Sequence, residues 1–591
     1  MKRFFRNVLA VILGNLLTFS LVLLVFIGFL MFSAAGDMFK SKGPKQNSVL
    51  EITLDMPIKE SSMENEFSIF APTTGESVYF RNIIKSIENA KNDDRIEGIS
   101  LKVSSFNGGS SQLSDIRDAL IDFKESGKFI YSYSHNSDQA AYILNSTADS
   151  LFQNPMGMLF LQGLSGEVMF YKDFGDKYGI DFQVIRHGDY KSAVEPFMRN
   201  DLSEENREQM EFLLNGIWKE YSTEIAKLRG VSLEELNASV DSLDAFNPEK
   251  ALNAKLVDKL VHERDYQKAL AKRLELDIKE DESVQKVLDK HTISLANYAG
   301  TLKPNTHKDR IAVLYASGVI TSGDGFSGIQ SEVYKNEIRK LAENDRIKAV
   351  VLRVNSPGGS ADAAEEILYE LKQLRQKKPI IVSFGDLAAS GGYYIAMEAD
   401  SIFTSPNTIT GSIGVLGMVP NIQTLMNNHG ITTDLVKTNE NSDFLNGIFR
   451  PMTDKGMETM TEMTENVYKI FVNHVSHARN MTFEEVDAVG GGRVWTGAQA
   501  LELGLVDALG TLDDAIEAAA AKAGLENYSI SSHPYRKGGI EEILNDMSMV
   551  KSEQYIQQEL GDEYFKIYKD LKFMKENKGI LVRMPFDIKI K

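Results

Sequence analysis

A buried strand, a glycine turn and the start of a helix follow one another in Ala349-Val-Val-Leu-Arg-Val-Asn-Ser-Pro-Gly-Gly-Ser360. A short apolar run rich in valine is typical of a strand that is buried on both faces. Further strands are expected at 310–315 and 379–383, with helices at 331–342 and 361–376. Strands that alternate with helices of about 10–15 residues indicate βαβ units. We therefore predict an α/β fold with a largely parallel sheet.

The same arrangement occurs a second time, 251 positions earlier in the chain. Identical residues at this offset include Arg95 and Arg346, Leu101 and Leu352, Gly108 and Gly359, Tyr142 and Tyr393, Asp149 and Asp400, and Gly163 and Gly414. A register that is held over such a span indicates two homologous domains. We expect them at 47–300 and 301–535 of the 591 residues, followed by a helical extension at 536–591.

The N-terminal segment has the composition of a membrane anchor. Basic residues in a short cytoplasmic N-terminus, 1–7, precede an apolar run from Val8 to Phe32. As a helix this run would be about 37 Å long, which is enough to cross a bilayer core. It is also longer than the stretch of about 7–15 apolar residues in a cleavable signal. We expect an uncleaved, single-pass transmembrane anchor at 8–32, with cleavage near Ser33-Ala34-Ala35 as the alternative.

The composition argues against several classes of protein. A net charge of -18 is unusual for a nucleic-acid binder, which normally presents a basic surface. The absence of cysteine removes disulfides, thiolate metal sites and a cysteine nucleophile. There is no His-Glu-x-x-His motif, and Gly411-Ser-Ile-Gly-Val-Leu-Gly417 lacks the spacing of a dinucleotide site. We therefore predict no metal, no cofactor and no nucleic-acid partner.

Two loops that follow strands of the second domain are candidates for a catalytic site, because active sites of α/β proteins gather there. In the loop 355–360, paired glycines and the following helix N-terminus can direct N–H groups at an oxyanion. A plain tight turn explains the same residues equally well. In the loop 386–394, Ser390 enters a helix and is followed by two glycines, which leave room for a substrate carbonyl. A helix-capping serine is the alternative.

A serine nucleophile needs a base, and comparison of the two domains indicates a lysine. None of the nine histidines clusters near either loop, and His187 is best explained as a surface residue. Ser390 corresponds to Gln139 in the first domain, whereas Lys191 of the first domain corresponds to Ser442 in the second. Each domain therefore holds one candidate and lacks the other. We expect a site assembled across the junction between the domains, although drift after duplication would leave the same pattern.

Four motifs, by their order and spacing, resemble the long, tandem-domain form of bacterial signal peptide peptidase A (protease IV): Tyr190-Lys-Ser-Ala193, Asn355-Ser-Pro-Gly-Gly359, Ala389-Ser-Gly-Gly-Tyr393 and Thr410-Gly-Ser-Ile-Gly414. The resemblance covers most of the chain. It implies two Clp-protease/crotonase-like domains and a membrane-anchored serine endopeptidase that degrades residual signal peptides after their release from preproteins. It also implies a homo-oligomer, a tetramer, in the bacterial inner membrane with a periplasmic catalytic body.

The resemblance implies a role for each of five residues. Ser390 would attack the scissile carbonyl, and Lys191 would act as the general base. Gly359 and Gly391 would donate backbone N–H groups to the oxyanion, and Ser412 would orient the lysine amine. Two alternatives compete with this function: a crotonase-like acyl-CoA enzyme, for which the sequence offers no carboxylate pair or basic nucleotide site, and a non-catalytic membrane scaffold.

This chemistry makes a severe demand on Lys191. A base that works near neutrality needs a pKa of about 7–8, whereas the pKa of a free lysine is about 10.4. Burial can lower the pKa because desolvation disfavours the ammonium form, at a cost of about 4 kcal/mol. We expect Lys191 to be enclosed at the domain junction with no carboxylate in reach. A direct ion pair with Glu195 would prevent it from acting as a base.

Overall fold

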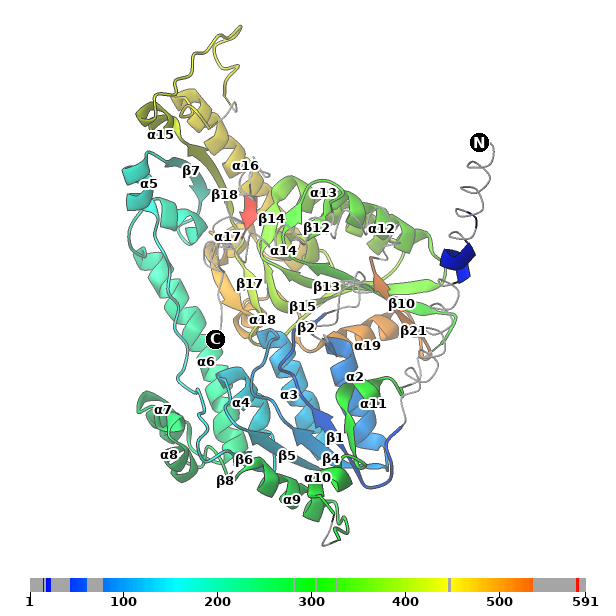
Figure 1. Cartoon of the computed structure of the whole chain (residues 1–591). Helices are drawn as coiled ribbons and strands as arrows, with labels where there is room; N and C mark the ends of the chain where they lie inside the picture. The colour runs from blue at the N-terminus through cyan, green and yellow to red at the C-terminus, as the bar shows by residue number, and fades with distance from the viewer. Residues whose placement is uncertain are drawn as a thin grey trace, which may run out of the picture.

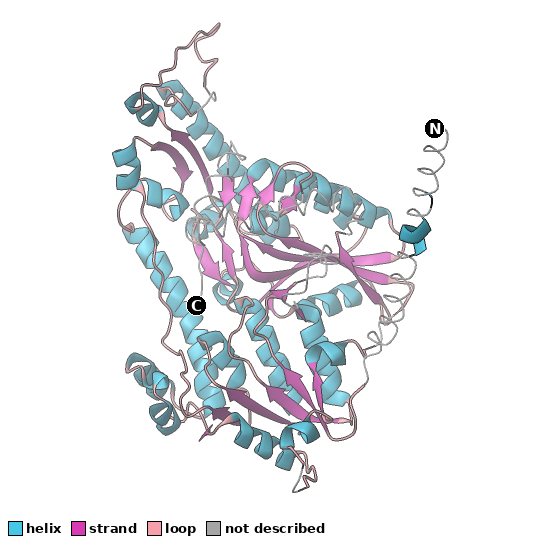
Figure 2. Ribbon diagram, in the orientation of Figure 1, coloured by secondary structure: helices cyan, strands magenta, loops and turns pink. Residues whose placement is uncertain are grey.

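A computed structural model of the chain describes residues 43–60, 78–279, 282–302, 306–325, 328–444 and 448–534, with the short pieces 14, 18–22 and 581–583. The predicted anchor and the predicted C-terminal extension lie almost wholly outside these residues. Within the described part of the chain, no helix is both long enough and apolar enough to cross a membrane. The body consists of two α/β halves, as Figures 1 and 2 show.

The first half is built on a six-stranded parallel sheet with the strand order β8-β6-β5-β4-β1-β9. Its strands are β1 (Ser48–Ile52), β4 (Ile96–Leu101), β5 (Phe129–Ser134), β6 (Ser150–Gln153), β8 (Lys259–Leu260) and β9 (Thr292–Ser294). Side chains alternate along β1, so that Leu50 packs with helices α2 (Phe80–Asn92) and α3 (Ser110–Lys124), whereas Val49 packs with α9 (Glu263–Arg273). Helices therefore cover both faces of the sheet.

The second half repeats this arrangement. Its main path runs β19-β17-β15-β13-β10-β21, and β16 and β20 continue from β15. The strands are β10 (Arg310–Ser317), β13 (Ile347–Ser356), β15 (Ile380–Ala389), β16 (Ser401–Thr404), β17 (Ile409–Gly411), β19 (Val494–Thr496), β20 (Ala508–Leu509) and β21 (Ser529–His533). Helices α12 (Ser331–Glu343) and α13 (Ala361–Arg375) cover one face, and α19 (Leu512–Lys522) covers the other.

These elements confirm the α/β prediction for the second half, and one difference in length matters for the candidate site. The strand expected at 379–383 continues to Ala389, because it pairs first with β13 and β16 and then with β17. Ser390 therefore follows the strand directly and begins helix α14 (Gly391–Ala396). The longer strand carries the serine to the edge where other loops meet.

A third sheet joins the two halves. Strand β7 (Asp181–His187), from the first half, pairs antiparallel with β18 (Val415–Asn421), from the second, with His187 opposite Val415. In Figure 1 these strands form an arm beside α16 (Asp454–Arg479). The core of the first half also includes Ala389 and Val494, which belong to the second half. The halves thus share packing as well as hydrogen bonds, and the end of β7 is held close to the ends of β15 and β17.

Candidate active site

Ser390 has an unusual backbone conformation for a non-glycine residue, with φ 56° and ψ -115°. Such geometry costs about 1–3 kcal/mol and persists only where the surroundings impose it. Here the N–H of Ser390 donates a hydrogen bond of 2.8 Å to the carbonyl of Gly411. The side chain is fully buried and makes no capping hydrogen bond with α14. The hydroxyl is therefore not used as a helix cap, which was the alternative explanation for this serine.

Lys191 lies between the end of β7 and a 3-10 helix, Ser192–Phe197. Its Nζ atom is 2.9 Å from Ser390 Oγ, 2.9 Å from Ser412 Oγ and 3.0 Å from the carbonyl oxygen of Ser412. All three residues have no exposed surface. The structure thus brings together, across the junction of the halves, three of the five residues that the sequence singled out.

The electrostatic surroundings of Lys191 favour an uncharged amine. Burial lowers the pKa of Lys191 well below its usual value. Among the described residues, no carboxylate comes within ion-pair distance of the amine, and Glu195 instead contacts Ser203, Asn206 and Arg186. Lys191 is therefore enclosed and has no ionic partner among the described residues, as we expected from the sequence.

Close approach of backbone segments encloses the lysine. A Cβ atom on Gly414 would lie 3.2 Å from Lys191 Cδ, and a Cβ atom on Gly492 would lie 2.6 Å from the Lys191 backbone nitrogen. Glycine is therefore required at 492, where φ is +89°. Gly492 is not among the site residues predicted from the sequence, although the run of three glycines at 490–492 was a signal that could have pointed to it.

The two predicted oxyanion residues lie on neighbouring elements. Gly391 is the first residue of α14, where backbone N–H groups have no partner within the helix. Gly359 lies in the short strand β14 (Gly358–Ser360), which contacts α14. The backbone just before β14 packs closely against α14, since a Cβ atom on Gly392 of that helix would lie 2.6 Å from the carbonyl oxygen of Ser356.

One further strand lies alongside this region. The C-terminal strand β22 (Leu581–Arg583), red in Figure 1, runs antiparallel to both β14 and β18 and lies between them. Val582 pairs with Gly359, and Leu581 pairs with Leu416. The space between β14 and β18 therefore accepts an extended peptide backbone.

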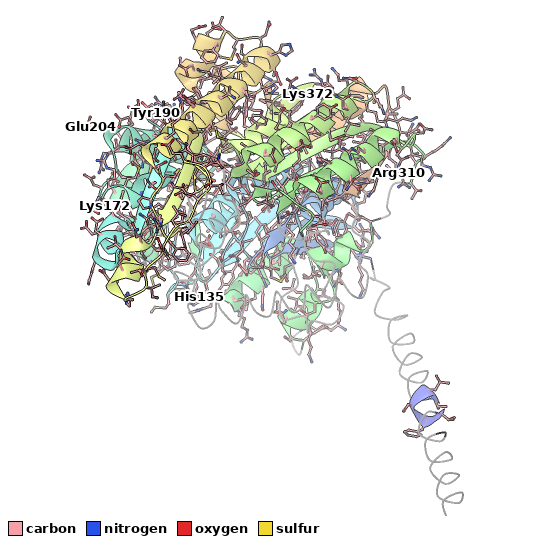
Figure 3. All side chains as sticks on the ribbon, turned by 90° about the horizontal axis from the view of Figure 1, so that it is seen from above. His135, Lys172, Tyr190, Glu204, Arg310 and Lys372 are labelled. Atoms are coloured by element: carbon pink, nitrogen blue, oxygen red, sulfur yellow. The ribbon has the colours of Figure 1, made fainter. Side chains whose placement is uncertain are left out.

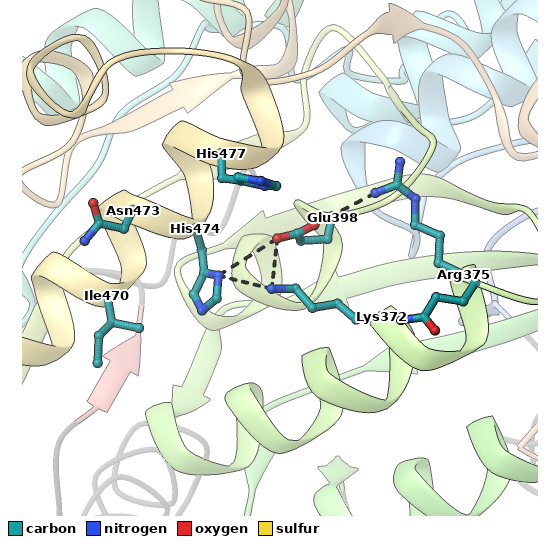
Figure 4. Close-up of a pocket in the computed structure, with 8 residues that line it drawn as sticks. Lys372, Arg375, Glu398, Ile470, Asn473, His474 and His477 are labelled. Atoms are coloured by element: carbon teal, nitrogen blue, oxygen red, sulfur yellow. Dashed lines mark hydrogen bonds and ion pairs between the residues drawn. The ribbon is translucent and has the colours of Figure 1, made fainter.

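Other polar surfaces lie apart from these residues. An open cleft of about 850 Å³ lies between α13 and α16 and contains none of the five candidates (Figure 4). Its charged groups pair with one another, as Lys372 does with Glu398 at 2.9 Å.

Figure 3 shows Tyr190, next to Lys191 in the sequence, where the cyan ribbon of the first half meets the yellow ribbon of the second. Within the described residues, no cluster of side chains is suited to hold a metal ion.

Comparison with known proteins gives matches in both halves of the chain. The model of peptidase family S49 matches residues 122–277 and 372–526, and that of Clp protease matches 303–410. Protease 4 of Salmonella typhi is 34% identical over 477 residues, which cover 79% of this chain and 76% of that protein. Protease 4 of Haemophilus influenzae is 31% identical, with coverages of 84% and 83%. The chloroplastic serine protease SPPA of Arabidopsis thaliana is 31% identical, with coverages of 81% and 70%.

Proposed function

Since the chain belongs to peptidase family S49 and is a serine peptidase, we propose that Ser390 and Lys191 form its catalytic dyad. The observation that carries this proposal is the 2.9 Å distance between Lys191 Nζ and Ser390 Oγ inside a buried junction. An activated serine needs an adjacent base within hydrogen-bond reach, and in the described residues the lysine is the group that meets this need.

The dyad would act in two steps. In the first, the lone pair of the neutral amine takes the hydroxyl proton as Ser390 Oγ attacks the scissile carbonyl. The ammonium then returns that proton to the leaving amine, which departs and leaves an acyl-enzyme ester on the serine. In the second, Lys191 takes a proton from a water molecule as the water oxygen attacks the ester carbonyl. The ammonium then returns the proton to Ser390 Oγ as the ester bond breaks, which releases the acid and restores the neutral lysine and the serine.

Ser412 would fix the direction of the lysine lone pair. A neutral amine has two N–H groups and one lone pair, and Lys191 Nζ has three neighbours at 2.9–3.0 Å. If the N–H groups are directed at the hydroxyl and carbonyl oxygens of Ser412, the lone pair is left facing Ser390. We assign Ser412 this orienting role.

The oxyanion would form next to backbone donors. We assign the N–H of Gly391 and of Gly359 as candidates, because α14 begins at the serine and β14 contacts that helix. A helix N-terminus adds a partial positive charge that stabilises developing negative charge.

The substrate would be an extended peptide that binds as a strand. Strand β22 supports this mode, since it lies between β14 and β18 with its backbone paired to both. Apolar side chains line the neighbouring β7–β18 region, where Val194 and Leu416 pack with Ala193 and Met418. We propose that apolar residual signal peptides are the substrates, that the anchor at 8–32 holds the enzyme at the inner membrane facing the periplasm, and that the enzyme works as a tetramer.

A serine-directed phosphonate tests the dyad. Wild-type enzyme is expected to be labelled at Ser390 and to lose its hydrolysis of casein and of synthetic signal peptides. Ser390→Ala should abolish labelling and hydrolysis. The matched control is Ser232→Ala, which removes a serine that does cap a helix, α7 (Leu233–Asp241), and should leave both unchanged. Hydrolysis that survives Ser390→Ala, or acyl-CoA turnover in its place, would refute the proposal.

A further inference from the structure

Tyr468, a buried residue of α16, connects several elements around the candidate site. Its ring stacks on that of His187, with ring centroids 3.7 Å apart and planes 26° from parallel. Its hydroxyl donates a hydrogen bond of 2.5 Å to Asp487 Oδ1 and accepts one of 3.2 Å from the N–H of Gly491. A single side chain thus contacts the end of β7, helix α17 (Phe483–Val489) and the glycine loop at 490–492.

The loop that Tyr468 contacts is packed against the backbone that carries the lysine. The N–H of Tyr190 donates to the carbonyl of Gly491 at 3.2 Å. A Cβ atom on Gly188 would lie 2.2 Å from that same carbonyl oxygen, and one on Gly492 would lie within 2.7 Å of the Lys191 backbone. The backbone of the segment 188–191 and that of the glycine loop are therefore in close contact.

The opposite side of the loop is bonded to the segment that carries Ser412. The N–H of Gly492 donates to the carbonyl of Ile413 at 2.8 Å, and the N–H of Ser412 donates to the carbonyl of Arg493 at 2.7 Å. Ser390 joins the same group through its hydrogen bond to Gly411. Residues 491–493 therefore contact the backbone that carries Lys191 and the backbone that carries Ser412, and Ser390 is linked to this group through Gly411.

We propose that Tyr468 is a positioning residue for the dyad: it anchors the glycine loop at 490–492 and so sets the place of Lys191 relative to Ser390 and Ser412. The proposal rests on the proposed function. It also gives a role to His187, which the sequence analysis treated as a surface residue. The imidazole lies flat on the Tyr468 ring, and its Nδ1 atom is 2.7 Å from Glu465 Oε1. The Tyr468 ring thereby holds the end of β7 at His187, four residues before Lys191.

The chemistry of a buried tyrosine suits this task. Its hydroxyl can donate to Asp487 and accept from Gly491 at the same time, which a phenylalanine at this position could not do. Burial raises the pKa of Tyr468, so the hydroxyl keeps its proton throughout the range in which the enzyme would work. The ionisable groups that face it are His187 from β7, Glu465 from its own helix and Asp487 from α17.

Tyr468→Phe is the direct test, because it keeps the ring on His187 and removes only the hydroxyl. We expect kcat for a peptide substrate to fall about 10- to 100-fold with little change in KM, since a small misplacement of catalytic groups costs this much. We also expect the acid limb of the pH–kcat/KM profile to move to higher pH, because a loosened junction lets water reach the lysine and favours its charged form.

Two further variants make the result decisive. Tyr142→Phe, the control, removes another buried tyrosine hydroxyl, which donates to Leu256 at 2.8 Å in the first half, and should leave kcat and the acid limb unchanged. Asp487→Asn weakens the same hydrogen bond by changing its acceptor. This variant should lower kcat and move the acid limb to higher pH, as Tyr468→Phe does. If Ser390→Ala and Lys191→Ala are inactive but both anchor variants match wild type in kcat and acid limb, this inference is overturned while the dyad stands. If the dyad variants retain activity, the proposed function fails first.

Discussion

Glu195 accepts a hydrogen bond of 2.6 Å from the hydroxyl of Ser203, so this buried carboxylate, four positions after Lys191 in the sequence, is engaged elsewhere. The amide of Asn206 contacts its other oxygen at 2.9 Å. Because the lysine has no ionic partner among the described residues, the effect of burial on its pKa is not opposed.

A permanent positive charge at position 191 should abolish catalysis. Arginine fills similar space but stays protonated, so it cannot accept the proton of Ser390. We expect Lys191→Arg and Lys191→Ala to lower kcat by about 10²–10⁴-fold, the usual contribution of a general base. Steady-state hydrolysis of a synthetic signal peptide measures the effect. An arginine variant with near wild-type kcat would show that the lysine acts only through its charge.

Removal of the amine should stabilise the fold, although it destroys activity. The unfolded chain binds a proton at Lys191 up to about the usual pKa of 10.5, whereas the folded chain, with the lowered pKa, does not. The unfolded state therefore holds more protons between these two values, and the stability of the wild type rises with pH across that window.

Lys191→Met is expected to unfold about 2–4 °C or more above the wild type at pH 7, a change typical of about 1 kcal/mol in a domain of this size. The difference should shrink as the pH approaches 10.5. Thermal melts from pH 6 to 10 measure it. Lys219→Met, on an exposed lysine of α6 (Glu204–Arg229), should have the same melting temperature as the wild type. A methionine variant less stable than wild type at pH 7 would contradict the prediction.

A buried carboxyl group at the junction of the halves gives the opposite dependence on pH. Burial, the largest cause, together with Glu60 and other nearby carboxylates, raises the pKa of Asp115 to about 8. One Asp115 oxygen is buried without a hydrogen-bond partner in the described structure. Arg353, also buried, is committed to Glu60 at 3.1 Å. The folded protein therefore holds a proton on Asp115 that the unfolded chain releases above about pH 4.

The contribution of Asp115 to stability is therefore expected to fall as the pH rises from about 4 to about 8. Asp115→Asn, which cannot ionise, should flatten this slope and melt at a higher temperature than wild type at pH 8. Asp122→Asn, on the same helix α3 and with a side chain that is about half exposed, is the control and should keep the wild-type slope. Melting temperatures at pH 5, 6.5 and 8 decide between these outcomes. An unchanged slope in Asp115→Asn would place the titration on another group.

Much of the candidate site could be predicted because duplication left a record in the sequence. The constant offset between the halves showed that Ser390 and Lys191 each lack an identical counterpart in the other half. In the structure these two residues and Ser412 meet at the junction. The pairing of β7 with β18 could not be predicted, since a strand's hydrophobic pattern does not name its partner. The support that Tyr468 gives to the lysine could not be predicted either. The run of three glycines at 490–492 is visible in the sequence, but nothing in the sequence shows that Tyr468 bonds to this loop.

The place of the C-terminal strand predicts how a substrate competes for the site. If peptides bind between β14 and β18, they must displace β22, whose backbone pairs with both strands. A proline lacks the N–H that a central strand needs, so Val582→Pro should weaken the pairing of β22. We expect KM for an apolar peptide to fall several-fold with kcat nearly unchanged, because Ser390, Lys191 and Ser412 keep their contacts. Val582→Ala keeps the N–H and should match wild type. An unchanged KM in the proline variant would mean that the substrate binds elsewhere than in the position of β22, even if the dyad itself is correct.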